Sequence, residues 1–385
     1  ILNSWDINMN TGTLNLNFDK SVNTSTLNVG GITLQDAATA TTSYTLTTST
    51  TASANGSSIT VDLSSADLNA IKSNTALLTS TANSYITLNS SVITDVAGGN
   101  PNAIILDGAA LQATSFTADT TSPSLVSWNV DMNSNTLSLN FDEVVNVSSL
   151  NIPAITVQDA VTGTSSFTLV SSTTASTNST TIVINLSTAD ANAIKLNPAL
   201  LTSTANSYII LGTLINDMNG NASNTIVDGF AMQATSFTPD TTNPFLTSWD
   251  VDMNAGTLTL NWSQPVNVAT FFNVGAITLQ DLATLTTSYT LTTSTTASGN
   301  GTTTVINLST ADLNAIKLNG GLLTSGANSF ITMTGSFIQD MASNPNDPIV
   351  DGAGVQVTGF TSDTTPPTLT SWDVNMNTNQ LTLNF

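Results

Sequence analysis

Four near copies of one tryptophan-containing segment set the organisation of this chain. The copies centre on Trp5, Trp128, Trp249 and Trp372, which follow one another at intervals of 123, 121 and 123 residues. A fixed spacing of this size is too long for a solenoid repeat and matches one independent domain. The sequence therefore predicts tandem repeats over 1–119, 120–240 and 241–363, followed at 364–385 by the first hairpin of a fourth.

Each copy is expected to open with a β-hairpin. In the first copy every second residue is apolar from 5 to 9 and again from 14 to 18, which is the period of a half-buried strand. Between these runs, the third residue after methionine is Gly12, Asn135, Gly256 or Asn379. Gly and Asn adopt positive φ at low cost, so this position is predicted to form the turn.

The rest of each repeat is rich in short strands and has one short helix. In the first copy a strand at 31–36 is followed by a Thr-rich segment at 43–63, predicted to be a second hairpin. A helix should begin after Ser64, with Asp67 completing a capping box and Lys72 as a solvated charge at its end. About seven strands and one helix within about 120 residues predict an all-β fold of tandem immunoglobulin-like sandwiches.

Composition excludes several functions. The chain has 4 Lys, no Arg and 25 acidic residues, for a net charge of −21. Such a chain cannot form a phosphate-binding surface, so neither nucleic acid nor an anionic membrane surface is an expected partner. It contains no Cys and no His, which removes Cys/His zinc sites and Ser–His–Asp catalysis.

The two ends and the hydropathy give further expectations. No run approaches 18 apolar residues, so direct membrane insertion is not expected. Residue 1 lacks the DTTxP lead-in of the other copies, and the chain stops after one hairpin, which is not stable alone. We therefore expect this sequence to be a window of a longer chain.

Several motifs resemble a known family. WSQPVN at 262–267, DMNGN at 217–221 and the DTTxP linkers are similar to bacterial Ig-like modules of S-layer and large surface proteins, including tandem modules in giant secreted proteins of marine microbes and algae. The resemblance covers the whole chain and implies an extracellular or cell-surface array with copies of itself as partner. The match is not uniform, since Lys20 and Glu143 stand where the third copy has Gln264.

Calcium at the inter-domain joints is the sharpest chemical hypothesis, because hard oxygen ligands suit Ca²⁺. The alternative is that these residues only cap turns through their own backbone. The candidate ligands are three aspartates in each repeat: Asp95, Asp107 and Asp119; Asp217, Asp228 and Asp240; Asp340, Asp351 and Asp363.

Two covalent modifications are also candidates. Asn55, Asn178 and Asn300 lie at equivalent predicted hairpin tips within N-x-S/T sequons and are the best candidates for N-glycosylation. A lysine at a helix end invites an isopeptide cross-link to an asparagine, although a solvated charge is the commoner role. Glu143, the only glutamate, is interpreted as part of a solvated turn and not as half of a glycosidase pair.

These observations favour a non-enzymatic structural protein, the repeat unit of an extracellular filament, stalk or surface array. The alternative is the shaft of an adhesin whose binding tip lies outside this sequence. An ancillary module of a secreted carbohydrate-active enzyme is the weakest candidate.

Overall fold

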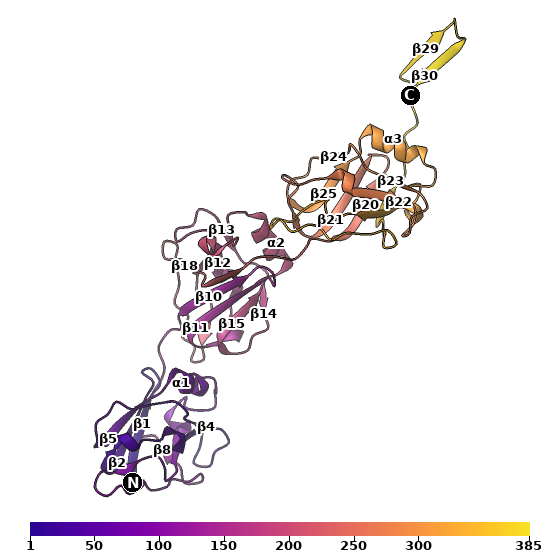
Figure 1. The fold of residues 1–385 in the computed structure, drawn as a ribbon. Helices are drawn as coiled ribbons and strands as arrows, with labels where there is room; N and C mark the ends of the chain where they lie inside the picture. Colours follow the sequence, from indigo (N-terminus) through magenta and orange to yellow (C-terminus); the bar gives the residue numbers. More distant parts are fainter. The chain divides into compact units, whose positions relative to one another are not determined.

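The computed structural model describes all 385 residues as three β-sandwiches followed by a two-stranded hairpin (Figure 1). The chain forms two compact units. The first comprises Ile1–Ala191 and Ala199–Thr238, and the second Asn192–Pro198 and Pro239–Phe385. Sandwich 1 (residues 2–117) and most of sandwich 2 (125–238) belong to the first unit, while sandwich 3 (246–361) and the hairpin belong to the second.

Sandwich 1 consists of two facing sheets and one helix. One sheet has the strand order β5-β2-β1-β9, with β7 paired to β2, and the other has the order β4-β3-β6-β8. The elements are β1 (Leu2–Asn8), β2 (Thr13–Asn23), β3 (Ile32–Gln35), β4 (Ser43–Thr45), β5 (Gly56–Asp62), α1 (Ser65–Lys72), β6 (Tyr85–Leu88), β7 (Thr94–Asp95), β8 (Leu111–Gln112) and β9 (Ser115–Thr117).

Sandwich 2 repeats this topology with one additional short edge strand. Its sheets have the orders β14-β15-β11-β10-β19, with β17 paired to β11, and β13-β12-β16-β18. The elements are β10 (Leu125–Asp131), β11 (Thr136–Asn146), β12 (Ile155–Gln158), β13 (Ser166–Thr168), β14 (Thr173–Thr174), β15 (Ser179–Asn185), α2 (Thr188–Leu196), β16 (Tyr208–Leu211), β17 (Asn216–Asp217), β18 (Met232–Gln233) and β19 (Ser236–Thr238).

Sandwich 3 has the same plan, with the sheet orders β24-β25-β21-β20-β28 and β23-β22-β26-β27. Its elements are β20 (Leu246–Asp252), β21 (Thr257–Val266), β22 (Ile277–Gln280), β23 (Ser288–Thr290), β24 (Thr295–Thr296), β25 (Gly301–Asn307), α3 (Thr310–Leu318), β26 (Phe330–Met333), β27 (Val355–Gln356) and β28 (Gly359–Thr361). The terminal hairpin is β29 (Ser371–Asn375) with β30 (Gln380–Asn384). The predicted fold class of tandem immunoglobulin-like sandwiches is confirmed.

The opening hairpins form as the alternation predicts. The turn residue has a φ of +64° at Gly12, +54° at Asn135, +68° at Gly256 and +52° at Asn379. These left-handed conformations explain why only Gly and Asn occupy the position. In each sandwich the first strand also pairs in parallel with the last strand, so the sheet brings together both ends of the repeat.

A tryptophan links the two sheets of each sandwich. The side chains of Trp5, Trp128 and Trp249 are 0 % exposed. Each lies on the first sheet, and its Nε1 donates to a backbone carbonyl of the second sheet at 2.8, 2.9 and 3.0 Å, respectively. The ring is buried and its one polar atom is satisfied, which is how a buried Trp stabilises a core. Trp372, on the terminal hairpin, is 59 % exposed.

Two local predictions for sandwich 1 are wrong. Residues 43–63 do not form one continuous hairpin, because β4 pairs with β3 while β5 pairs with β2 in the opposite sheet, and the backbone pairing within the segment is the antiparallel bridge between Thr50 and Asp62. Asp67 does not complete a capping box either. Ser64 caps α1 by accepting from the Asp67 amide, but the Ser64 amide donates to Ser49 Oγ at 3.1 Å.

The Asp67 carboxylate instead ties α1 to the segment that crosses between the sheets. It accepts hydrogen bonds from Tyr44 Oη at 2.8 Å and from the amides of Thr47, Thr48 and Ser49 at 2.9 to 3.0 Å. Burial raises the pKa of Asp67, but these hydrogen bonds outweigh it and hold the pKa well below its usual range. The helix is therefore positioned by a buried, ionised side chain.

Candidate functional site

The second aspartate of each predicted calcium set (Asp107, Asp228 or Asp351) accepts hydrogen bonds from a nearby loop. Asp107 Oδ1 accepts from Gln35 Nε2 at 3.1 Å and from the Ala40 amide at 2.8 Å. Asp228 makes the equivalent bonds to Gln158 and Gly163, and Asp351 accepts from the Leu285 amide. These contacts match the turn-capping alternative, and none of the three belongs to an acidic cluster.

The first aspartate of each set closes the D-x-x-G-N type turn. Asp217 Oδ1 accepts from the amides of Asn219 and Asn221 at 2.9 and 2.7 Å, and its Oδ2 accepts from Asn221 Nδ2. Asp95 and Asp340 bond their own turns in the same way. Unlike Asp95, Asp217 is buried and has acidic neighbours.

Three carboxylates converge in the first unit. One oxygen from each of Asp119, Glu143 and Asp217 lies within 4.8 Å of the others, and all three residues are buried. Asn221 Nδ2 donates to the Asp119 carbonyl at 3.1 Å, which joins the linker to the turn. The linker aspartate thus meets the turn of the repeat that follows it, and not Asp95 of the repeat that precedes it.

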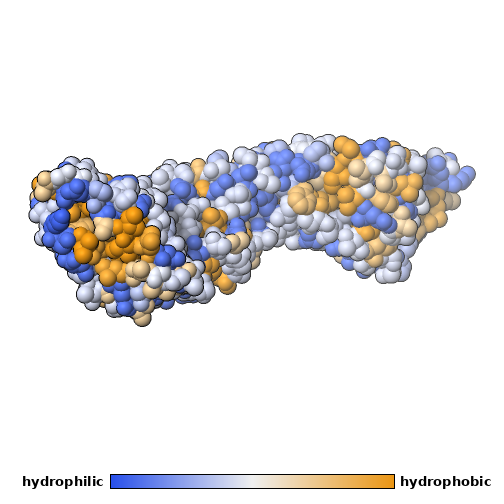
Figure 2. Space-filling model, turned by 90° about the horizontal axis from the view of Figure 1, so that it is seen from below, coloured by the Kyte–Doolittle hydropathy of each residue, from blue (hydrophilic) through white to orange (hydrophobic).

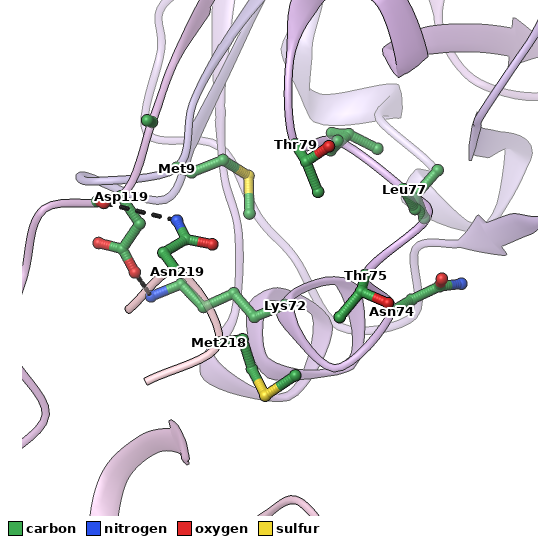
Figure 3. A pocket seen from close by; sticks show the side chains of 11 residues that line it. Met9, Lys72, Asn74, Thr75, Leu77, Thr79, Asp119, Met218 and Asn219 are labelled. Atoms are coloured by element: carbon green, nitrogen blue, oxygen red, sulfur yellow. Dashed lines mark hydrogen bonds and ion pairs between the residues drawn. The ribbon is translucent and has the colours of Figure 1, made fainter. Parts of the chain in front are cut away.

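Lys72, at the end of α1, lies among these carboxylates. Its Nζ is 2.6 Å from Asp119 Oδ2 and donates a hydrogen bond to Glu143 Oε2 at 2.7 Å. The side chains of Lys72, Asp119 and Glu143 are 7, 1 and 9 % exposed. Figure 3 shows Lys72 and Asp119 pointing at one another at the wall of a cavity of about 430 Å³. We call Lys72, Asp119, Glu143 and Asp217 the joint cluster.

Two expectations from the sequence are therefore wrong. Lys72 is not a solvated helix-end charge, and Glu143 is not part of a solvated turn. A further contact explains why both are buried, since Asn69 Oδ1 on α1 accepts a hydrogen bond from the Val144 amide on β11. This packing of the helix of one repeat on a strand of the next buries the ion pairs between them.

The ionisation of the joint cluster is uneven. Burial raises the pKa of Glu143 to about 7, because the favourable contact with Lys72 only partly offsets desolvation. Burial alone would lower the pKa of Lys72, but its two carboxylate neighbours raise it. Burial works against ionisation of Asp119 too, yet Lys72 and the Thr121 amide lower the pKa of Asp119. Near neutral pH the cluster thus holds a Lys–Asp ion pair beside a carboxyl group that readily exchanges a proton.

Equivalent residues meet in the second unit. Lys195 Nζ lies 2.7 Å from Asp240 Oδ2 and also donates to Gln264 Oε1 at 2.7 Å. Gln264 Nε2 in turn donates to Asp340 Oδ2 at 2.9 Å, so Gln264 occupies the position of Glu143. Lys317 pairs with Asp363 at 2.7 Å, but these side chains are 35 and 30 % exposed.

The glycosylation candidates are all exposed at loop tips. Their side-chain oxygens accept from backbone amides of a segment 31 residues earlier in the chain: Asn55 from Thr24, Asn178 from Val147 and Asn300 from Ala269. These contacts give each asparagine a structural role. N-glycosylation at these positions stays a prediction.

The joint cluster can hold a divalent cation, because three carboxylates are hard oxygen donors. Lys72 already contacts two of them, so calcium must compete with its ammonium group. As long as Lys72 keeps its ammonium group, we expect an affinity at the weak, roughly millimolar end for the natural chain, as in extracellular calcium modules, and a tighter one for Lys72→Met.

Thermal unfolding of both proteins with calcium and with a chelator checks this prediction. The melting temperature of Lys72→Met should rise more with calcium than that of the natural chain. Equal melting temperatures in calcium and chelator for both proteins would show that the cluster binds no calcium.

Comparison with known proteins adds little. The sequence matches no protein-family model, and no curated protein is similar to it at a significant level. Among solved structures, it is similar to the S-layer protein rSbsC(31-844), with a TM-score of 0.20 and 11 % identity over 99 % of this chain and 56 % of that chain. Domains 1-6 of the surface layer protein SbsC give a TM-score of 0.20 and 12 % identity over 100 % of this chain and 58 % of that chain. Domains A168-A170 of titin give a TM-score of 0.18 and 10 % identity over 91 % of this chain and 96 % of that chain.

The chain thus spans less than two thirds of the length of the S-layer chains it matches. TM-scores this low mean that the chains do not superpose as wholes, so we draw no functional argument from them. No helix of this chain has the length and apolar character needed to cross a membrane.

Proposed function

We propose that this chain is a structural segment of an extracellular filament, stalk or cell-surface array, and that it bears load without catalysing a reaction. The observation that carries this proposal is a recurring ion pair. Lys72, Lys195 and Lys317 each lie in the last turn of a helix, and each contacts the aspartate that opens the next DTTxP linker. An ion pair repeated at this position restrains the linker relative to the helix, which suits a chain that must resist bending.

Copies of the same chain are the proposed partner. Figure 2 shows hydrophobic residues gathered in patches on this face, with a broad patch at the left of the view and hydrophilic residues between the patches. Some exposed apolar side chains recur at one loop position, with Leu106 67 %, Val227 56 % and Val350 63 % exposed. Apolar side chains that recur in this way can form repeated contacts with neighbouring chains. With a net charge of −21, association between copies should strengthen as salt screens their repulsion.

Electron microscopy of the purified chain at increasing concentration and ionic strength tests the proposal. We expect filaments or sheets with a regular repeat, and their loss when Leu106, Val227 and Val350 are all replaced by Asp. Circular dichroism of that variant should be unchanged, because the three side chains are exposed. Monodisperse single chains under all conditions, together with binding to a glycan or receptor, would instead support the adhesin shaft.

A further inference from the structure

The three equivalent Lys–Asp pairs have different surroundings. The Lys317–Asp363 pair is about one-third exposed, and no third carboxyl group contacts Lys317. The Lys195–Asp240 pair is buried, but its third partner is the amide of Gln264. Only the Lys72–Asp119 pair is both buried and in contact with an additional acid, Glu143.

The Asp119 carboxylate is oriented for a reaction at its carbon atom. Its Oδ2 lies 2.6 Å from Lys72 Nζ, while its Oδ1 accepts a hydrogen bond from the Thr121 amide at 3.0 Å. An amide that donates to Oδ1 stabilises negative charge developing on that oxygen when a nucleophile adds to the carbon. Oδ2, on the side of Lys72 and Glu143, is then the oxygen that can leave.

We propose that Lys72 and Asp119 form an intramolecular isopeptide bond, with Glu143 as the acid–base residue. The amine nitrogen of Lys72 bonds to the side-chain carbon of Asp119, and the bond from that carbon to Oδ2 breaks. Two protons pass in turn from the Lys72 nitrogen through the Glu143 carboxyl group to Oδ2, which departs as water. Ammonium and carboxylate become amide and water, so the step needs no cofactor, oxidant or added reactant.

In water an amine and a carboxylate do not condense to an amide, and the fold favours this reaction in two ways. Holding two reacting groups in contact is equivalent to an effective concentration of about 10⁵ M or more, and burial keeps out the water that drives hydrolysis. Glu143 Oε2 lies 2.7 Å from Lys72 Nζ, so this carboxyl group is placed to accept protons from the amine and return them.

The product would fasten the end of α1 to the linker by a covalent bond. It would close the segment 72–119 into a loop that cannot extend under tension. The proposal does not depend on assembly into a filament, since the bond lies within one chain.

Mass spectrometry and tryptic mapping test the bond directly. The purified chain, incubated at neutral pH and then denatured, should be lighter than its sequence by one water molecule. The chain has four lysines and no arginine, so trypsin can cut only after residues 20, 72, 195 and 317. A bonded Lys72 blocks its site, and 21–195 should appear as one fragment in place of 21–72 and 73–195.

Two variants exchange Glu143 of the joint cluster and Gln264, which has the equivalent position beside Lys195. Glu143→Gln copies the Gln264 arrangement, which the fold tolerates, and should restore both the full mass and the cut after residue 72. Gln264→Glu should install a second bond, with loss of a further water molecule and of the cut after residue 195.

A natural chain with full mass and complete cleavage after residue 72 would overturn the proposal. So would loss of water from Glu143→Gln at the same position, because the reaction would then not use the acid. Failure to form filaments would leave both readouts unaffected, so this test is separate from that of the proposed function.

Discussion

Replacing Asp67 by Ala should destabilise sandwich 1 by about 4 kcal/mol, because several buried donors lose one charged acceptor together. Asp67 is 0 % exposed, and the amides of Thr48 and Ser49 donate to its Oδ2 at 3.0 and 2.9 Å. Urea unfolding of the natural and mutant chains measures the difference. Asp62→Ala is the matched control, since Asp62 lies exposed on β5 and should change stability by less than about 0.5 kcal/mol.

The chain also contains a graded comparison. Asp190 occupies the position of Asp67 in sandwich 2, but Phe167 and Val170 replace Tyr44 and Thr47, two of the three residues whose hydroxyl groups bond Asp67. Asp190→Ala should therefore cost less than Asp67→Ala. Equal losses, or a loss below about 1 kcal/mol for Asp67→Ala, would contradict this account of the helix anchor.

The lowered pKa of Asp67 also predicts how the stability of the chain changes at acid pH. The pKa of Asp67 is held below 3.8, its ordinary value, so its stabilising effect is complete above that pH and is lost as the pH falls toward the folded-state pKa. The natural chain should lose stability from about pH 4 downward. Asp67→Asn should flatten this dependence for sandwich 1.

Replacing Trp249 by Ala should lower the stability of sandwich 3 by about 4 kcal/mol, as for other large buried aromatic residues. Trp249 is 0 % exposed and its Nε1 donates to the Val355 carbonyl, so the substitution opens a cavity and leaves an acceptor unpaired. Scanning calorimetry should show one transition moving to lower temperature while the others stay in place. Trp372→Ala is the control, because Trp372 has the equivalent position on the exposed terminal hairpin.

A shift of all transitions together in Trp249→Ala would contradict the prediction. It would mean that the repeats unfold as one cooperative body and do not have separate cores.

Local features of the fold could be predicted because their causes lie within a few residues. The positive φ at Gly12 and Asn135, the Ser64 cap and the burial of Trp5 each follow from a short pattern. The 43–63 hairpin failed because alternation shows which residues are buried but not which sheet a strand joins. The role of Asp67 as part of a capping box was wrong because the spacing of Ser64 and Asp67 does not show that stronger hydrogen-bond donors lie about 20 residues earlier in the chain.

The joint cluster was harder to predict because it combines three separate parts of the chain. The sequence predicts that Asp119 meets Asp95, the turn aspartate of its own repeat. Its neighbour in the structure is Asp217, the equivalent turn aspartate of the following repeat. No local pattern places Glu143 against Lys72, since the two are 71 residues apart and belong to different repeats. The lysine that recurs near each helix end was the sequence signal for this cluster. Its interpretation as a solvated charge is the reason that the cluster was not predicted.

Stretching single molecules of the chain between two attachment points tests most directly whether these sandwiches bear load in series. The account predicts three separate unfolding events, each lengthening the chain by roughly 350 Å or less, from about 3.5 Å per released residue. The event of sandwich 1 should release less chain if Lys72 and Asp119 are bonded. A single event for the whole chain, or extension without resolved events, would contradict the claim that this protein spans distance through a series of independent β-sandwiches.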